Sequence, residues 1–121
     1  FLQGGATTQF ALLPMNFAAA DQPADYVLTG HWGEKAQKEA KSVCVSKIAA
    51  SAETSNYTTV TPVDEWALSD NAAYLHVTPN ETIHGVEFYD LPASSAPVIA
   101  DVSSTLLSRT LDVSRYGVLY A

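Results

Sequence analysis

The chain has 121 residues, with six basic and thirteen acidic side chains that give a net charge of −7. This length suits one modest domain. The acidic balance argues against binding to nucleic acid or to an anionic membrane surface. An acidic protein can still hold a single phosphate group at a backbone site.

Cys44 is the only cysteine, so an intrachain disulfide is excluded and a reducing, cytoplasmic location is expected. No apolar run approaches the roughly 18 residues of a membrane-spanning helix. The three histidines, His31, His76 and His84, lack the spacing of a zinc motif, and no metal site is expected.

Strand-like and helix-like segments alternate along the chain. In chain order the expected elements are a strand at 1–3, a helix at about 7–17, a strand at 24–29, a helix at 31–43, and strand candidates at 43–50, 57–63, 72–77, 85–88, 97–102 and 116–121. Pro14 predicts a kink or an early end of the first helix. The alternation predicts an α/β fold with a mainly parallel sheet flanked by helices, which binds ligands at the carboxyl ends of its strands.

Both ends of the chain have strand-like sequences without a polar tail. Natural termini are usually polar and frayed. We therefore expect residues 1–121 to be a fragment of a larger domain.

The segment Gly4–Phe10 joins a predicted strand to a predicted helix. Small residues there let backbone N–H groups approach an anion, and the hydroxyl groups of Thr7 and Thr8 add donors. The segment lacks the lysine and the glycine spacing of the known nucleotide-binding loops. A tight turn followed by an N-cap threonine is the alternative interpretation.

Two further polar segments follow predicted strands. Trp32 belongs to the segment Thr29–Trp32 at the end of the strand at 24–29; it could form a flat platform for an aromatic ring, or it could belong to the core. The run Pro79–Gly85 follows the strand at 72–77 and offers the hydroxyl group of Thr82 to a ligand; the alternative is a capping turn.

Asp101 stands at the end of the apolar strand predicted at 97–102. A carboxylate in this position is costly unless it meets a cation or several hydrogen-bond donors. A protonated ring nitrogen of a ligand would be such a partner. Alternatively, Asp101 caps the segment 103–107.

Taken together, these segments resemble the phosphoserine aminotransferases, a group of class V, fold type I enzymes that use pyridoxal 5'-phosphate. The matching strings are GGATTQFALLPMNF, ADYVLTGHWGEKAQKEAK, DNAAYLHVTPNETIHGVEF and IADVSSTLLSRTLDVSRYGVLYA. The resemblance implies that residues 1–121 form part of the cofactor-binding large domain of such an enzyme.

The resemblance also assigns roles to five residues around the cofactor. Ala6 and Thr7 would hold its phosphate, and Trp32 would stack on its pyridine ring. Thr82 would contact the phenolic oxygen, and Asp101 would pair with the ring nitrogen.

The implied reaction is amino transfer between L-glutamate and 3-phosphohydroxypyruvate, which yields O-phospho-L-serine, in a homodimeric protein that could also serve pyridoxine synthesis. The family's Schiff-base lysine would lie beyond Ala121, and the small C-terminal domain would also lie outside this chain. No catalytic residue is therefore expected within residues 1–121, and this fragment alone is expected to be inactive.

Two other classes of function remain open. Another class V enzyme, of the alanine–glyoxylate aminotransferase or cysteine desulfurase type, would share the aspartate and the aromatic platform. A non-catalytic phosphate-binding or interaction module is the alternative from another class.

Overall fold

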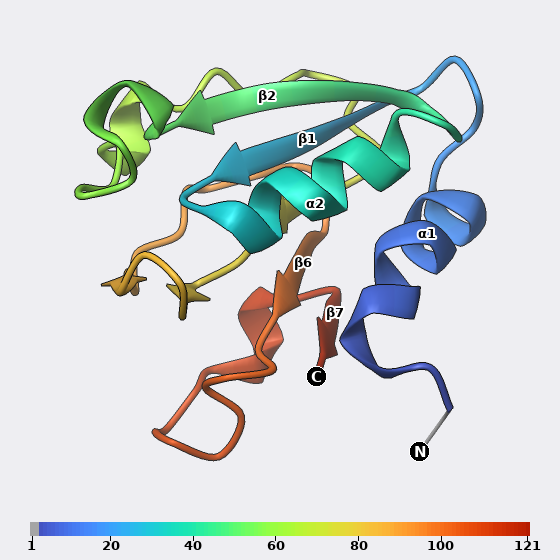
Figure 1. The fold of residues 1–121 in the computed structure, drawn as a ribbon. Coiled ribbons are helices and arrows are strands. Elements are labelled where there is room, and N and C mark those ends of the chain that lie inside the picture. Colours follow the sequence, from blue (N-terminus) through green and yellow to red (C-terminus); the bar gives the residue numbers. More distant parts are fainter. Residues whose placement is uncertain (1–2) are drawn as a thin grey trace.

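The computed structural model describes residues 3–121, and its centre is a five-stranded parallel sheet (Figure 1). The strands follow the order β2-β1-β3-β6-β7, and every neighbouring pair is parallel. Their bounds are Pro23–Leu28 (β1), Val45–Ser51 (β2), Leu75–Val77 (β3), Val98–Asp101 (β6) and Val118–Tyr120 (β7). The predicted α/β fold with a mainly parallel sheet is confirmed.

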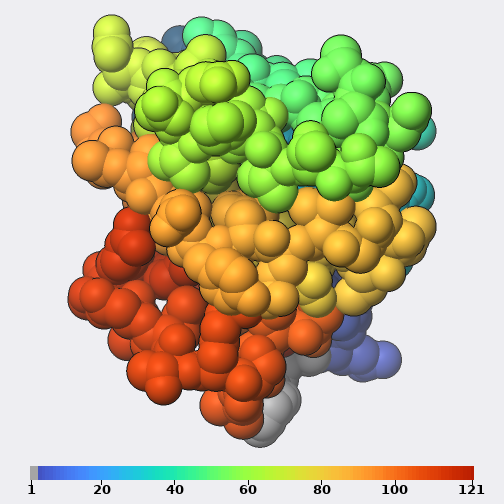
Figure 2. All heavy atoms as spheres, turned by 90° about the vertical axis from the view of Figure 1, so that its left-hand side faces the viewer, coloured from blue at the N-terminus to red at the C-terminus, as the bar shows by residue number. Residues whose placement is uncertain are grey.

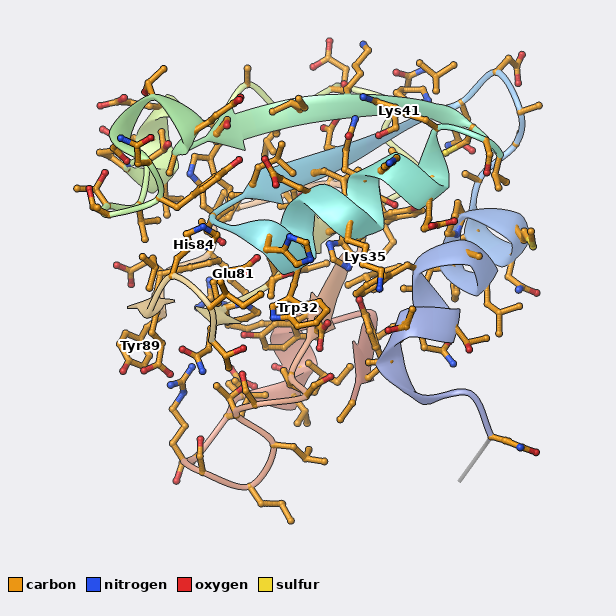
Figure 3. All side chains as sticks on the ribbon, in the orientation of Figure 1. Trp32, Lys35, Lys41, Glu81, His84 and Tyr89 are labelled. Atoms are coloured by element: carbon orange, nitrogen blue, oxygen red, sulfur yellow. The ribbon has the colours of Figure 1, made fainter. Side chains whose placement is uncertain are left out.

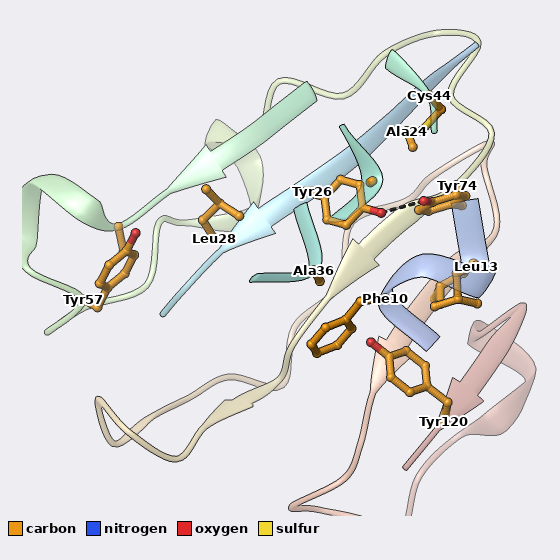
Figure 4. Packing of buried hydrophobic residues seen from close by; sticks show 13 residues of the cluster. Phe10, Leu13, Ala24, Tyr26, Leu28, Ala36, Cys44, Tyr57, Tyr74 and Tyr120 are labelled. Atoms are coloured by element: carbon orange, nitrogen blue, oxygen red, sulfur yellow. Dashed lines mark hydrogen bonds between the residues drawn. The ribbon is translucent and has the colours of Figure 1, made fainter. Parts of the chain in front are cut away.

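Two helices cover one face of this sheet, α1 (Gly5–Phe17) and α2 (His31–Ala40). In α1, Phe10 and Leu13 are buried, and they pack with Tyr26 and Tyr120 from the sheet and with Tyr74, which directly precedes β3 (Figure 4). Because neighbouring residues of a strand point to opposite faces, Tyr26 faces the helices while Val27 faces away from them.

The other face of the sheet is covered by irregular segments. Val27, Leu75, Val77 and Val98 pack there against Trp66 and other side chains from loops. β1 and β3 are buried along their whole length, as expected for central parallel strands with both faces covered.

A small antiparallel hairpin lies outside the main sheet, formed by β4 (Asn80–Glu81) and β5 (Val86–Glu87). Its turn closes with a hydrogen bond of 2.8 Å from the amide of Gly85 to the carbonyl of Glu81. Gly85 has a φ of 71°, a left-handed conformation that favours glycine. The strand predicted at 85–88 is therefore part of a hairpin and not a sixth strand of the sheet.

The prediction of a strand at 57–63 is wrong. The chain there forms turns between two short 3-10 helices, Glu53–Ser55 and Val63–Glu65. The amide of Tyr57 donates to the carbonyl of Ala52 at 3.0 Å, so this segment bonds to its own preceding turn instead of to a strand.

Other differences concern the ends of elements. The helix with Pro14 continues to Phe17, so the early end expected at the proline is not observed. The helix predicted at 31–43 ends at Ala40. The first two residues of the strand predicted at 1–3 lie outside the described residues, and Gln3 belongs to a turn.

The strands of the sheet end on one side of the molecule, where the segments that follow them lie side by side. Figure 2 looks onto this side, and bands in green, amber and red mark the segments after β2, β3 and β6. Across residues 3–121, no helix combines the length and apolar character needed to cross a membrane.

Candidate cofactor site

A cavity of about 270 Å³ opens where α1 begins and where the segments after β1, β3 and β6 meet. This volume is close to the lower end of the range for small-molecule sites, roughly 300–1,000 Å³. All five residues singled out from the sequence line it: Ala6, Thr7, Trp32, Thr82 and Asp101. Residues up to 95 positions apart in the sequence are thus brought to one place.

The N-terminus of α1 forms one wall of the cavity, through Gly5, Ala6 and Thr7. The helix begins after Gly4, and no side chain caps its first turn. The hydroxyl group of Thr8 instead donates back to the carbonyl of Gly4 at 2.7 Å, so the N-cap threonine considered above is not found. The first amide groups of a helix have no partner within it, and they are left available to an anion.

Trp32 and Thr82 form a joined pair on another part of the wall. The indole Nε1–H of Trp32 donates to Oγ1 of Thr82 at 3.1 Å. The indole group can only donate, so the hydroxyl of Thr82 is the acceptor and keeps its own proton for another partner. Trp32 is half-buried and also packs against the core, so it combines the two interpretations considered from the sequence.

Asp101 ends β6 and is 8% exposed. Its Oδ1 accepts hydrogen bonds from the amide and the hydroxyl of Ser103, at 3.0 and 2.5 Å. Within the described chain, no lysine or arginine forms an ion pair with this carboxylate. Asp101 therefore caps the turn that follows it, and its second oxygen remains able to accept a hydrogen bond from a ligand.

Thr78 is a further polar residue of the wall. Its side chain is 2% exposed, and its Oγ1 has no hydrogen-bond partner among the described residues. A buried hydroxyl group without a partner is rare and costly. Together with the uncapped helix start and the second oxygen of Asp101, it indicates a site shaped for a polar, partly anionic ligand.

An aromatic layer supports the cavity from behind. Phe10 lines the cavity and packs edge-on against Tyr120, with ring centroids 6.3 Å apart. The hydroxyl of Tyr120 lies 2.8 Å from Nε2 of His76, which stacks on Tyr26. Burial lowers the pKa of His76 to about 3, so its ring is neutral near pH 7.

None of the four lysines of the sequence lines the cavity. Lys38, Lys41 and Lys47 are exposed, and the ammonium group of Lys35 lies 5.7 Å from the ring centroid of Trp32, outside the lining (Figure 3). Among residues 3–121, no group of histidine, cysteine or carboxylate side chains is arranged to hold a metal ion.

Sequence reasoning missed Glu81, the residue that holds Trp32 in place. It is fully buried, and its two carboxylate oxygens accept hydrogen bonds from the amides of Trp32 and Gly33. Two sequence features could have pointed to Glu81: it is a carboxylate inside the polar run after β3, and the helix that starts after Gly30 has no capping side chain of its own.

The fold is that of a pyridoxal-phosphate type of transferase domain, and the sequence model of the family described as Aminotransferase class-V matches residues 1–121. The chain belongs to this family.

Within the family, the similar proteins are phosphoserine aminotransferases. The chain is 56% identical to the one from Stenotrophomonas maltophilia (strain K279a) and 54% identical to one from Xanthomonas oryzae pv. oryzae (strain MAFF 311018). Both alignments cover 100% of this chain and 34% of the relative. The chain thus spans about a third of the length of these curated relatives.

Solved structures agree with this assignment. The phosphoserine aminotransferase from Bacillus circulans subsp. alkalophilus superposes with a TM-score of 0.93 at 52% identity, over 97% of this chain and 33% of that one. The pyridoxal-phosphate-bound phosphoserine aminotransferase from Trichomonas vaginalis superposes with a TM-score of 0.80 at 39% identity. That superposition covers 95% of this chain and 35% of the Trichomonas vaginalis chain. The resemblance stated from the sequence is confirmed.

Proposed function

We propose that this chain is the cofactor-binding part of a phosphoserine aminotransferase. The complete protein would use pyridoxal 5'-phosphate to transfer an amino group between L-glutamate and 3-phosphohydroxypyruvate, giving O-phospho-L-serine. One observation carries the proposal: the five residues expected to hold the cofactor line a single cavity. The names of the similar proteins, and the pyridoxal phosphate bound to the Trichomonas vaginalis protein, support the choice of substrate and cofactor.

The start of α1 would bind the cofactor's phosphate. The free amide groups near Ala6 and Thr7 point out of the helix end, where the helix dipole adds partial positive charge. The hydroxyl of Thr7 would add one more donor. This wall needs no lysine or arginine to attract an anion, which suits a chain of net charge −7.

Trp32 and Thr82 would orient the ring. The indole gives a flat apolar surface, and its hydrogen bond to Thr82 fixes the plane of that surface. Because Thr82 accepts this bond, its proton is free to be donated to an oxygen of the ring.

Asp101 would hold a proton on the ring nitrogen. Its Oδ1 is fixed by Ser103, and Oδ2 is the oxygen that would accept this N–H. Bound pyridoxal phosphate supplies an electron sink for the electron pair left on the substrate α-carbon when a proton is removed. A protonated ring nitrogen makes that sink stronger. The buried carboxylate of Asp101 would favour the protonated form of the ring nitrogen, because the two opposite charges attract each other.

The lysine that anchors the cofactor is proposed to lie outside residues 1–121, because no lysine of this chain lines the cavity. The small C-terminal domain, the cytoplasmic location, the homodimer and a part in pyridoxine synthesis remain predictions from the family resemblance.

The proposal is tested by assaying the complete protein with 3-phosphohydroxypyruvate, glyoxylate and cysteine as alternative substrates. Formation of O-phospho-L-serine that requires both L-glutamate and pyridoxal phosphate supports the proposal. Turnover of only glyoxylate or cysteine would assign the protein to another class V activity. Phosphate binding without any turnover would favour a binding module.

A further inference from the structure

The helix that carries Trp32 does not cap its own N-terminus. Gly30 precedes α2 and has no side chain, so the first amides of the helix need partners from elsewhere. Glu81 supplies two acceptors: Oε2 lies 3.0 Å from the amide of Trp32, and Oε1 lies 2.8 Å from the amide of Gly33. Nδ1 of His84 lies 3.4 Å from the amide of His31. The cap comes from a hairpin about fifty residues further along the chain (Figure 3).

Glu81 is held tightly in this position. Its side chain is 0% exposed, and no lysine or arginine among the described residues pairs with it. A buried carboxylate without a cation needs strong hydrogen bonds, and the positive end of a helix provides them. Gly30 leaves the space that the carboxylate fills, because a Cβ there would lie 2.7 Å from Cδ of Glu81.

The next residue of the hairpin holds the other end of Trp32. Glu81 binds the backbone amide of Trp32, and Thr82 accepts the indole N–H at 3.1 Å. A tryptophan side chain has only two rotatable bonds, so fixing its amide and its Nε1 determines the plane of the ring. Trp32 and Thr82 both line the cavity, whereas Glu81 lies behind them and is not part of the lining.

We propose that Glu81 is a positioning residue that sets the orientation of Trp32 for the bound cofactor. It acts through Trp32 and makes no contact with the cofactor itself. The effect on cofactor affinity rests on the function proposed above, whereas the effect on Trp32 does not. A residue that only stabilises α2 would weaken cofactor binding to the same extent whether or not Trp32 were present.

The test uses the complete protein with the substitution E81Q, which keeps the size of the side chain but places the donor NH₂ of its carboxamide against one of the two backbone N–H groups. E87Q is the matched control, because Glu87 lies on the same hairpin, faces solvent and pairs with Arg109. Each protein is also made in a W32F background. The near-ultraviolet circular dichroism of the cofactor-free protein, minus that of its W32F counterpart, reports on Trp32 alone.

We expect E81Q to change this Trp32 signal and to weaken pyridoxal phosphate binding about tenfold, with E87Q changing neither. In the W32F background, E81Q should then have little further effect on affinity. An unchanged Trp32 signal, or an equal loss of affinity in both backgrounds, would overturn the proposal.

If E81Q does not fold, E81D serves instead, since it keeps the charge but is one methylene too short to reach both amides. Should the wild-type protein bind no pyridoxal phosphate, the proposed function fails, and the cofactor-free Trp32 signal still decides the role of Glu81.

Discussion

Ser103 donates both its backbone amide and its hydroxyl group to the same oxygen of Asp101, Oδ1, at 3.0 and 2.5 Å. This pair fixes the carboxylate at the end of β6 and makes it part of the following turn. One oxygen of Asp101 therefore serves the fold, and the other is left for a ligand in the cavity.

Because the two oxygens of Asp101 have different partners, D101N is an informative substitution. The asparagine keeps an oxygen for Ser103, but it presents an NH₂ donor where a protonated ring nitrogen needs an acceptor. We expect the protein to fold while its affinity for pyridoxal phosphate falls about 10- to 100-fold, the range for a hydrogen bond to a charged group. Affinity is measured by absorbance titration.

S103A is the control for this experiment. It loosens the carboxylate of Asp101 without removing the acceptor, so its loss of affinity should be less than about tenfold. An unchanged affinity in D101N would mean that Asp101 serves only the turn.

The unpartnered hydroxyl of Thr78 gives a prediction about stability. Valine has nearly the same shape and removes the unsatisfied buried oxygen. We expect T78V to raise the free energy of unfolding of the cofactor-free protein by about 1 kcal/mol, measured in urea. T78S, which keeps the hydroxyl, should show no such gain. If T78V is less stable than the wild type, Oγ1 has a partner in the protein without cofactor.

The low pKa of His76 predicts how stability depends on pH. The folded protein holds this ring neutral down to about pH 3, whereas the unfolded chain protonates it near pH 6.5. The contribution of His76 is therefore fully present above about pH 6.5 and is lost as the pH falls. Relative to H76Q, the wild type should lose about 2 kcal/mol between pH 6.5 and pH 5. Equilibrium unfolding of both proteins at each pH measures this difference, and a constant difference would contradict it.

Gly30 and Glu81 should be strongly coupled. A Cβ at position 30 would meet Cδ of Glu81 at 2.7 Å, so G30A should lower the free energy of unfolding by about 1–3 kcal/mol. In an E81A background the obstacle is gone, and G30A should cost much less. The free energy of unfolding of the wild type, G30A, E81A and the double variant is measured by thermal or urea unfolding. If G30A lowers it equally in both backgrounds, the close contact with Glu81 is not the cause of the destabilisation.

The sequence predicted the parallel sheet well because apolar runs such as 24–29 and 97–102 are central strands, buried on both faces whatever the details of packing. The segment 57–63 failed because β propensity depends on a partner strand. That stretch bonds to its own preceding turn, and Asn56 and Tyr57 adopt positive φ values of 52° and 57°.

The candidate site was predictable to a similar, partial extent. Ala6, Thr7, Trp32, Thr82 and Asp101 lie near the ends of predicted elements, and the carboxyl ends of parallel strands meet at one edge. Glu81 could not be found in this way. Its partners lie 48 and 49 residues earlier in the sequence, and only the folded chain brings the hairpin to the start of α2.

We propose that residues of four separate segments hold the cofactor in one cavity. A crystal structure of the complete protein with pyridoxal phosphate decides whether they do. We expect the ring against Trp32, its nitrogen within hydrogen-bond distance of Asp101, and the phosphate at the start of α1. A cofactor bound elsewhere, or one whose phosphate lies at Asp101, would rule out this arrangement.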